Sequence, residues 1–292
     1  MFKFKSLGIS LLLAIIGISV ILSPLQASRT DTKIYYQDQV AVLMYHHIHD
    51  QDKSSGTITT ALFDNQLKEL TERGYQFISL TEFKQFMQGA SVPANAVLIT
   101  FDDGYQSFYT SAYPLLKSRQ IPAVNFVITG TLANPLATYI PYMTNEQISE
   151  MTHDAESSID AQCHTDSLHD KLPNGKAKIV GHIEKDGLTE TDEAYNQRIL
   201  QDITTCRDKL SVLGEKPIDS LAYPFGITNK QASKLVHEAG IDYAFTIIPK
   251  MATRSSDPLR IPRINAGNPN ITPELLHRDI QRRIVARPNK EK

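Results

Sequence analysis

The fold class is decided by residues 96–104, whose sequence is AVLITFDDG. The first six residues are apolar or β-branched, and the acidic pair Asp102-Asp103 and Gly104 follow them directly. An uninterrupted apolar run of this length is typical of a strand that is buried on both faces of a parallel sheet. Polar residues at its end predict a functional site, because α/β folds carry their chemistry at the carboxyl ends of the strands.

The rest of the chain repeats this strand and helix alternation. Predicted strands cover 39–48, 76–80, 96–101, 121–129, 159–164, 220–225 and 243–247. Predicted helices start at Thr60 and Thr81, cover 107–118, 192–213 and 229–240, and follow the caps Thr144 and Thr272. Such an order implies a parallel sheet covered by helices, either closed as a barrel or open and doubly wound. The polar segment 170–191 has no hydrophobic period and is interpreted as a surface excursion.

Length and charge limit the protein classes that fit. The chain has 292 residues, a formal charge of −2 and 41% hydrophobic residues. This composition is that of a globular protein, and the length fits one α/β barrel of roughly 250 residues. Because the sequence has no basic block, we expect no nucleic-acid partner.

The N-terminus is typical of an export signal. Lys3 and Lys5 precede an uncharged apolar run over 7–22, and small residues follow around Ala27. We therefore predict a signal peptide over 1–27, cleaved after Ala27, and a secreted or cell-surface protein. The alternative is an uncleaved N-terminal anchor, although the run is shorter than the roughly 20 residues of a comfortable membrane span.

Two groups of polar residues could hold a metal ion. Asp102 and Asp103 repel each other at the end of a buried strand, which a cation or a shared proton would compensate. The alternative is an Asp-Asp-Gly turn that caps the next helix. His164 ends another predicted strand, and His169 follows five residues later. Two imidazoles and one carboxylate suit zinc and leave positions open for water and substrate, as in a catalytic site.

Three motifs in this order resemble those of the polysaccharide deacetylase superfamily, also called carbohydrate esterase family four or NodB homology. They are TFDDG at 100–104, HTDSLH at 164–169 and LAYPFG at 221–226. An MYHHI stretch at 44–48 before the acidic motif is similar to the adhesin-type deacetylases of poly-β-1,6-N-acetylglucosamine. The resemblance implies a distorted (β/α)7-type barrel, with the deacetylase domain over 38–288.

The resemblance also implies a role for each matching residue. Asp103, His164 and His169 match the ligands of one divalent ion, with zinc first and Co²⁺, Ni²⁺ or Fe²⁺ as alternatives. Asp102 matches the general base that takes a proton from the attacking water, and the backbone N–H of Phe225 matches an oxyanion donor. His46 takes the part of the acid that protonates the leaving amine, with His47 as second choice, although His47 should face the other way on a strand.

The sequence departs from the superfamily pattern in two places. The arginine that normally orients the base, upstream of Tyr223-Pro224, is replaced by Leu221 and Ala222, so we name Arg263 as the candidate for contacting Asp102. The alternative for Arg263 is an ordinary surface arginine. The chain also lacks tryptophan, so a sugar platform would use Tyr, Phe or backbone. The two cysteines, Cys163 and Cys206, are either bridged or two buried thiols.

The expected function is a secreted, metal-dependent amide hydrolase. It would remove acetyl groups from poly-β-1,6-N-acetylglucosamine of an adhesin or biofilm matrix, acting as a monomer with peripheral cell-surface or membrane association. Alternatives are a deacetylase of peptidoglycan or chitooligosaccharides and a non-catalytic polysaccharide-binding protein. A phosphoryl-transfer enzyme is disfavoured, because no glycine-rich phosphate loop is present.

Overall fold

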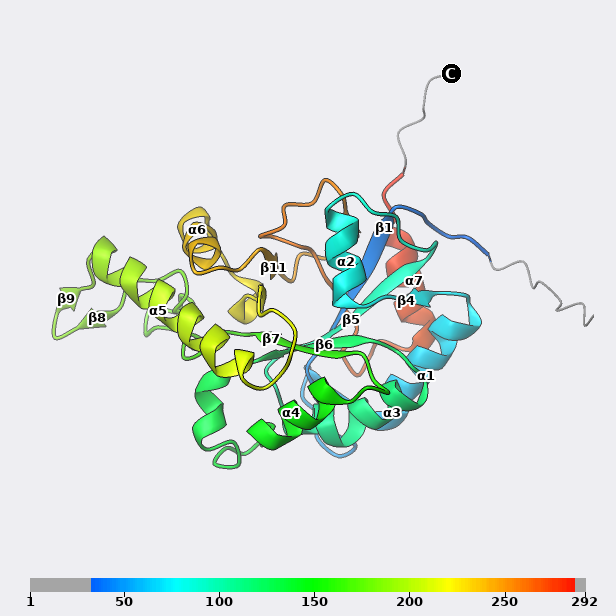
Figure 1. The fold of residues 1–292 in the computed structure, drawn as a ribbon, viewed down its shortest axis with the longest axis horizontal. Coiled ribbons are helices and arrows are strands. Elements are labelled where there is room, and N and C mark those ends of the chain that lie inside the picture. The colour runs from blue at the N-terminus through cyan, green and yellow to red at the C-terminus, as the bar shows by residue number, and fades with distance from the viewer. Residues whose placement is uncertain (1–32, 287–292) are drawn as a thin grey trace, which may run out of the picture. The chain divides into compact units, whose positions relative to one another are not determined.

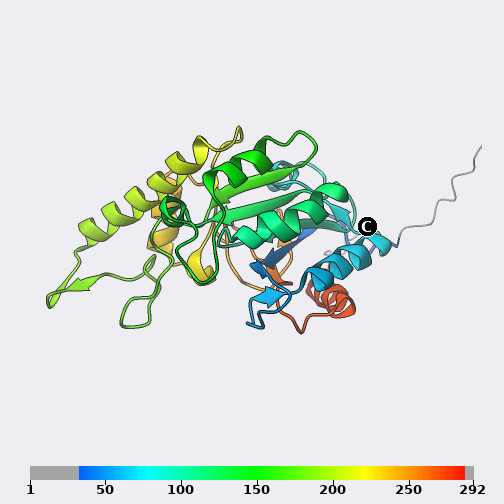
Figure 2. The ribbon, with the colours of Figure 1, turned by 90° about the horizontal axis from the view of Figure 1, so that it is seen from below.

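The computed structural model describes residues 33–286, which form a curved, mostly parallel sheet with helices around its outside (Figures 1 and 2). The strand order is β11-β10-β7-β6-β5-β1-β12, with β13 beside β1 and β4 beside β5. Only β12 runs antiparallel to its neighbour in this sheet. The strands are β1 (Gln39–Tyr45), β4 (Gln76–Phe77), β5 (Ala96–Phe101), β6 (Ala123–Val127), β7 (Ile159–Cys163), β10 (Ser220–Ala222), β11 (Tyr243–Phe245), β12 (Ala252–Thr253) and β13 (Ile264–Asn265).

The helices begin where the sequence supplies N-caps. Thr59, Ser79, Thr144, Thr191, Asn229 and Thr272 each accept a backbone N–H of the first helical turn through the side chain. These caps start α1 (Thr60–Glu72), α2 (Leu80–Met87), α4 (Asn145–His153), α5 (Asp192–Ser211), α6 (Lys230–Glu238) and α7 (Pro273–Arg283). A short π-helical turn, Phe108–Ala112, precedes α3 (Tyr113–Ser118). The predicted start of α2 at Thr81 was late, because Ser79 and Glu82 form the capping box there.

The segment 258–266 closes the sheet into a distorted barrel. On one side it exchanges backbone hydrogen bonds with β11, where Ile261 N–H donates to Ala244 and Thr246 N–H donates to Ile261. On the other side β13 pairs in parallel with β1. The predicted α/β barrel is therefore confirmed, and its last stretch is too short and irregular to be found by strand periodicity.

Side chains of the main strands alternate between the barrel interior and the helix layer. On β1, Val40 and Val42 join the interior cluster, whereas Leu43 and Tyr45 pack under the helices. On β5 the interior positions are Ala96 and Leu98, so the same alternation continues inward through Thr100 to Asp102. Phe83 of α2 packs against Phe245 with ring centroids 5.8 Å apart, so α2 adds its aromatic face to the interior cluster.

Two short strand pairs complete the fold. The short strands β2 (His47–Ile48) and β3 (Thr57–Ile58) pair with each other beside the end of β1. The predicted surface excursion at 170–191 carries the exposed hairpin of β8 (Glu184–Lys185) and β9 (Leu188–Thr189).

Candidate membrane-spanning helices are absent from the described part of the chain: within residues 33–286 no helix has both the length and the apolar composition that a membrane crossing requires. The predicted signal peptide at 1–27 lies outside the described residues.

Candidate metal centre and active site

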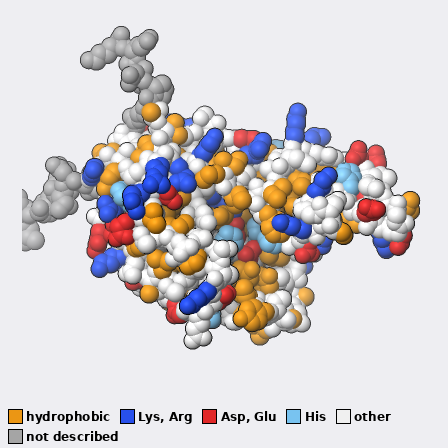
Figure 3. Space-filling model, turned by 180° about the vertical axis from the view of Figure 1, so that it is seen from behind, with side chains coloured by type: hydrophobic (Ala, Val, Ile, Leu, Met, Phe, Trp, Pro, Cys, Tyr) orange, Lys and Arg blue, Asp and Glu red, His pale blue; other side chains and the backbone are white. Residues whose placement is uncertain are grey.

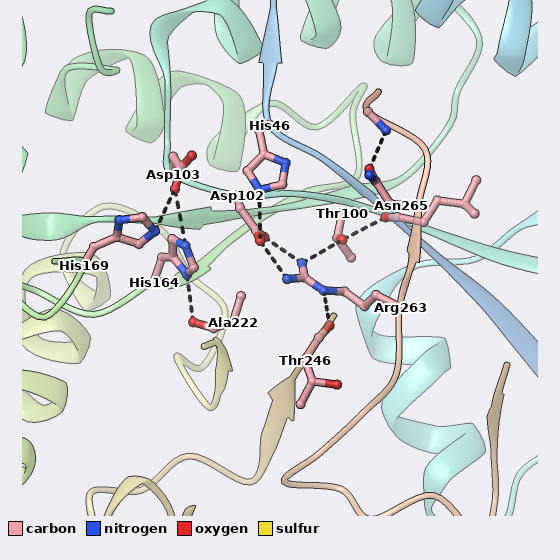
Figure 4. A network of polar contacts seen from close by, with 12 residues as sticks. His46, Thr100, Asp102, Asp103, His164, His169, Ala222, Thr246, Arg263 and Asn265 are labelled. Carbon is pink, nitrogen blue, oxygen red and sulfur yellow. Dashed lines mark hydrogen bonds and ion pairs between the residues drawn. The ribbon is translucent and has the colours of Figure 1, made fainter. Parts of the chain in front are cut away.

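The candidate residues meet at the carboxyl ends of β1, β5 and β7, at one mouth of the barrel (Figure 4). Each follows the inward-facing series of its strand: Asp102 comes after β5, His164 after β7 and His46 after β1. Asp103 turns out of the series because its backbone is left-handed, with φ of 75°. That turn brings a second carboxylate to the same mouth. Asp102 can therefore contact Arg263, while Asp103 faces His164 and His169.

Asp103, His164 and His169 converge on one point. Oδ1 of Asp103 lies 3.3 Å from Nε2 of His164 and 3.3 Å from Nε2 of His169. Their possible ligand atoms all lie within 4.8 Å of one another, and within residues 33–286 this is the one group of three or more His, Cys, Asp or Glu that could hold an ion. Asp103 and His164 are buried, and the His169 side chain is 24% exposed. The triad is thus reachable from solvent on one side.

The donor set fits a divalent cation. The Nδ1 of His164 lies 2.7 Å from the carbonyl of Ala222, so a proton on Nδ1 is donated there and Nε2 turns its lone pair toward Asp103. Oδ1 of Asp103 is buried and accepts no hydrogen bond from the described residues. Three lone pairs that face one another at this distance need a shared proton or a cation between them.

The ionisation of the triad follows from its burial and its charges. Burial alone would raise the pKa of Asp103, but His164, with His46 and His169, holds that pKa well below its ordinary value. Burial alone would lower the pKa of His164, yet Asp103 and Asp102 raise it. Burial and the nearby His164 lower the pKa of His169. The site therefore holds an ionised carboxylate and favours positive charge beside it, as a cation site should.

Arg263 forms a two-pronged ion pair with Asp102 inside the barrel. Nη1 lies 2.6 Å from Oδ1 and Nη2 lies 2.7 Å from Oδ2, and the arginine side chain is fully buried. Nε donates to the Thr246 carbonyl at 2.9 Å, and Nη1 also lies 3.2 Å from the Thr100 hydroxyl. The alternative of a surface arginine is therefore wrong. Arg263 comes from the closing segment 258–266.

The charge of Arg263 keeps Asp102 ionised. Burial alone would raise the pKa of this carboxyl, but Arg263, with His164 and His46, lowers it overall. Each carboxylate oxygen has two lone-pair positions, and Arg263 occupies one on each. Asp102 can therefore hold its orientation and still accept a further hydrogen bond.

His46 and His47 face opposite ways, as the strand alternation predicts. Nε2 of His46 lies 3.9 Å from Oδ2 of Asp102, and its side chain is 30% exposed. His47 is buried, and its Nδ1 lies 2.8 Å from the Ser107 hydroxyl. Burial, followed by the neighbouring His49, lowers the pKa of His47. Of the two imidazoles, His46 is the one that reaches both the carboxylate and solvent.

Phe225 reaches the site from the turn that follows β10. This 3-10 turn spans Pro224–Gly226, and Phe225 is left-handed within it, with φ of 59°. The Phe225 ring contacts His169 with centroids 4.7 Å apart. A Cβ on Gly226 would stand 2.4 Å from a side-chain carbon of Ile247, so only glycine fits this turn. The turn thus places the Phe225 ring against His169, one of the three candidate ligands.

Tyr105 and Tyr142 border the site, and sequence reasoning did not select either of them. Their rings stack with centroids 5.1 Å apart, and burial and Asp103 raise the pKa of Tyr105. Tyr105 follows the acidic motif by one residue, which is a local signal, whereas Tyr142 arrives from a loop. Figure 3 shows histidine side chains in a hollow of this face, flanked by hydrophobic side chains.

Cys163 and Cys206 form a disulfide that ties β7 to α5. Cys163 ends β7 and faces the helix layer, so the following residue, His164, faces the mouth of the barrel. The alternative of two buried thiols is therefore not what the structure shows.

Comparisons with known proteins agree with this architecture. Residues 89–244 match the family described as polysaccharide deacetylase. A poly-β-1,6-N-acetyl-D-glucosamine N-deacetylase of Staphylococcus aureus (strain MSSA476) is 27% identical over 208 residues, covering 71% of this chain and 67% of the relative. The protein of the same name in Staphylococcus epidermidis is 28% identical over 259 residues, covering 83% of this chain and 84% of that protein.

Solved structures with the same fold are also known. A de-N-acetylase from Aggregatibacter actinomycetemcomitans superposes with a TM-score of 0.74 at 23% identity, covering 83% of this chain and 100% of that one. IcaB from Ammonifex degensii superposes with a TM-score of 0.70 at 25% identity, covering 84% of this chain and 97% of that one.

Proposed function

The chain belongs to the polysaccharide deacetylase family and is an amide-bond hydrolase, and from that premise we propose that it is an exported, metal-dependent N-deacetylase of poly-β-1,6-N-acetyl-D-glucosamine. The observation that carries the proposal is the convergence of Asp103, His164 and His169 beside the ion-paired Asp102. The substrate is supported by the names of the staphylococcal relatives. Export is supported by the N-terminal sequence and by a disulfide, which survives in oxidising compartments.

In this proposal Asp103, His164 and His169 hold one divalent ion, with zinc first among the candidates because two imidazoles and a carboxylate suit it. Such an ion polarises the amide carbonyl and lowers the pKa of a water molecule. Asp102 accepts the proton of the attacking water at a carboxylate oxygen, and the Phe225 N–H donates to the oxyanion that forms on the former carbonyl.

His46 completes the reaction as the acid. When the carbon–nitrogen bond breaks, the amine nitrogen takes a proton from His46, and acetate and a free amine leave. Nε2 of His46 lies 3.9 Å from Oδ2 of Asp102, which is beyond direct hydrogen-bond distance. The proton held by Asp102 therefore returns to His46 through a water molecule or after the imidazole moves closer. One water is consumed per acetyl group, and both side chains recover their starting protonation.

An acetate-release assay on the β-1,6 polymer tests the proposal. Wild-type protein with added Zn²⁺ or Co²⁺ is compared with Asp103→Asn and His164→Ala, and we expect each variant to lose activity by at least a hundredfold. Equal activity in all three proteins would refute the metal assignment. Faster release from β-1,4-linked chitooligosaccharides or peptidoglycan than from the β-1,6 polymer would refute the proposed substrate.

A further inference from the structure

Asp202 is a buried carboxylate that the proposed reaction does not use. It lies on α5 and is 8% exposed. Its Oδ1 accepts the backbone N–H of Asp166 at 2.8 Å, and its Oδ2 accepts the backbone N–H of Ser167 at 2.7 Å. Burial raises the pKa of Asp202 to about 6, even though both hydrogen bonds lower it. A group that is costly to ionise here needs a reason to be present.

The two N–H groups belong to the loop that carries both candidate histidine ligands. His164 begins this loop and His169 ends it. Between them Thr165 is left-handed, with φ of 70°, which is an unfavourable conformation for a β-branched residue. A loop with such a residue keeps its shape only if neighbouring groups hold it. A carboxylate bonded to two successive amides fixes the orientation of both peptides.

Two more residues of α5 contact the same stretch of chain. Cys206 is bridged to Cys163, and Nζ of Lys209 lies 2.7 Å from Oδ1 of Asp166. Positions 202, 206 and 209 are spaced by four and three residues, so they lie on one face of the helix. Figures 1 and 2 show α5 running beside β7, and the two elements pack directly against each other. One helix face thus holds residues 163–167 through a disulfide, an ion pair and two backbone hydrogen bonds.

We propose that Asp202 is a positioning residue for the metal site: by fixing the loop 164–169 it sets the affinity of His164 and His169 for a divalent ion. The proposal rests on the proposed function. Its physical basis is preorganisation, since the apparent dissociation constant equals the intrinsic constant divided by the fraction of molecules whose loop is competent to bind. Without the carboxylate the loop samples other conformations, and that fraction falls.

The decisive variant is Asp202→Asn, which keeps the volume of the side chain. Its amide oxygen can accept one of the two backbone N–H groups, but the amide NH₂ then faces the other, donor against donor. The matched control is Asp208→Asn, the same change at an exposed position of the same helix. Co²⁺ binding is followed by the visible absorption of the bound ion, and Zn²⁺ binding by competition with a chelator. Hydrogen exchange of peptides covering 164–169 is measured in metal-free protein.

We expect Asp202→Asn to raise the dissociation constant for Co²⁺ and Zn²⁺ about tenfold or more, to change the Co²⁺ spectrum and to speed exchange over 164–169. Asp208→Asn should stay within about twofold of wild type. All measurements are made well below the unfolding midpoint of each protein, where a merely structural role moves neither affinity nor spectrum. Unchanged affinities and exchange in Asp202→Asn would overturn the proposal.

The outcomes also separate this proposal from the proposed function. Wild-type protein that binds Co²⁺ but releases no acetate refutes the proposed function, and the affinities of the variants still decide the role of Asp202. Wild-type protein that binds neither ion refutes both proposals. Deacetylation with unchanged metal affinity in Asp202→Asn refutes the role of Asp202 alone.

Discussion

Replacing Arg263 by methionine removes the cation that contacts both oxygens of Asp102. Asp102 is 3% exposed and Arg263 is fully buried, so water does not replace the lost contacts. Breaking a buried ion pair from one side costs about 3–5 kcal/mol, because the remaining charge is uncompensated. We expect Arg263→Met to lower the free energy of unfolding by that amount near neutral pH.

The unfolding free energy lost in Arg263→Met should increase as the pH rises. In the wild type the pKa of Asp102 is lowered, so its contribution to stability is present above the unfolded-state pKa of about 4 and is lost as the pH falls below it. In Arg263→Met the lowering by Arg263 is lost, and burial raises the pKa of Asp102 against the weaker effect of His164 and His46. The contribution of Asp102 to the variant's stability is then largest at low pH and is lost as the pH rises. The stability gap between the two proteins therefore widens from pH 4 toward pH 8.

Two measurements check this reasoning, and both use Arg278→Met as the control because that arginine is exposed. Urea unfolding of the metal-free proteins at several pH values gives the stability gap. The pH profile of kcat/KM for acetate release should have its acidic limb at higher pH in Arg263→Met, since Asp102 must be ionised to accept a proton. A stability gap below about 1 kcal/mol at pH 8, together with an unmoved acidic limb, would refute the role given to the ion pair.

Three further predictions use single residues. His46→Gln should lower kcat for acetate release about 10²–10⁴-fold and His47→Gln less than tenfold, and the reverse order would move the acid role to His47. Cys206→Ser should lower the free energy of unfolding by about 2–4 kcal/mol, because the bridge closes a loop with a separation of 43 residues; urea unfolding with and without reductant checks this. Burial raises the pKa of Asp202 to about 6; the negative charge of Asp166 adds to this shift and Arg198 opposes it. The contribution of Asp202 to stability is therefore largest below pH 4 and is lost as the pH rises through about 6. The unfolding free energy of wild type relative to Asp202→Asn should therefore fall by up to about 3 kcal/mol between pH 4 and pH 7 in metal-free protein, and a rise would contradict the burial argument.

The long strands and the capped helices could be predicted from the sequence because their signals are local. The apolar run at 96–101 and the N-caps at Thr144 and Thr272 need only a few neighbouring residues to be recognised. The inward positions of Asp102 and His164 follow from strand alternation once the strands are known. The choice of Asp103 rather than Asp102 as a metal ligand came from the resemblance to the deacetylase motifs, because Asp103 leaves the strand alternation through its left-handed backbone.

Other parts of the site depend on contacts between distant segments. Arg263 was named only as a candidate, because nothing in its own neighbourhood shows that its side chain enters the barrel and meets a residue 161 positions away. Asp202 gave no signal at all, since an aspartate on a polar helix is usually exposed. Tyr142 comes from an irregular loop whose path has no sequence period.

The closing segment 258–266 has two roles in the structure. It completes the barrel between β11 and β1, and it delivers the guanidinium that orients Asp102. Because this segment follows Asp103, His164 and His169 in the chain, those three residues are synthesised before Arg263. Under the proposed function, Asp102 is therefore oriented as a base only after the segment 258–266 has joined the barrel.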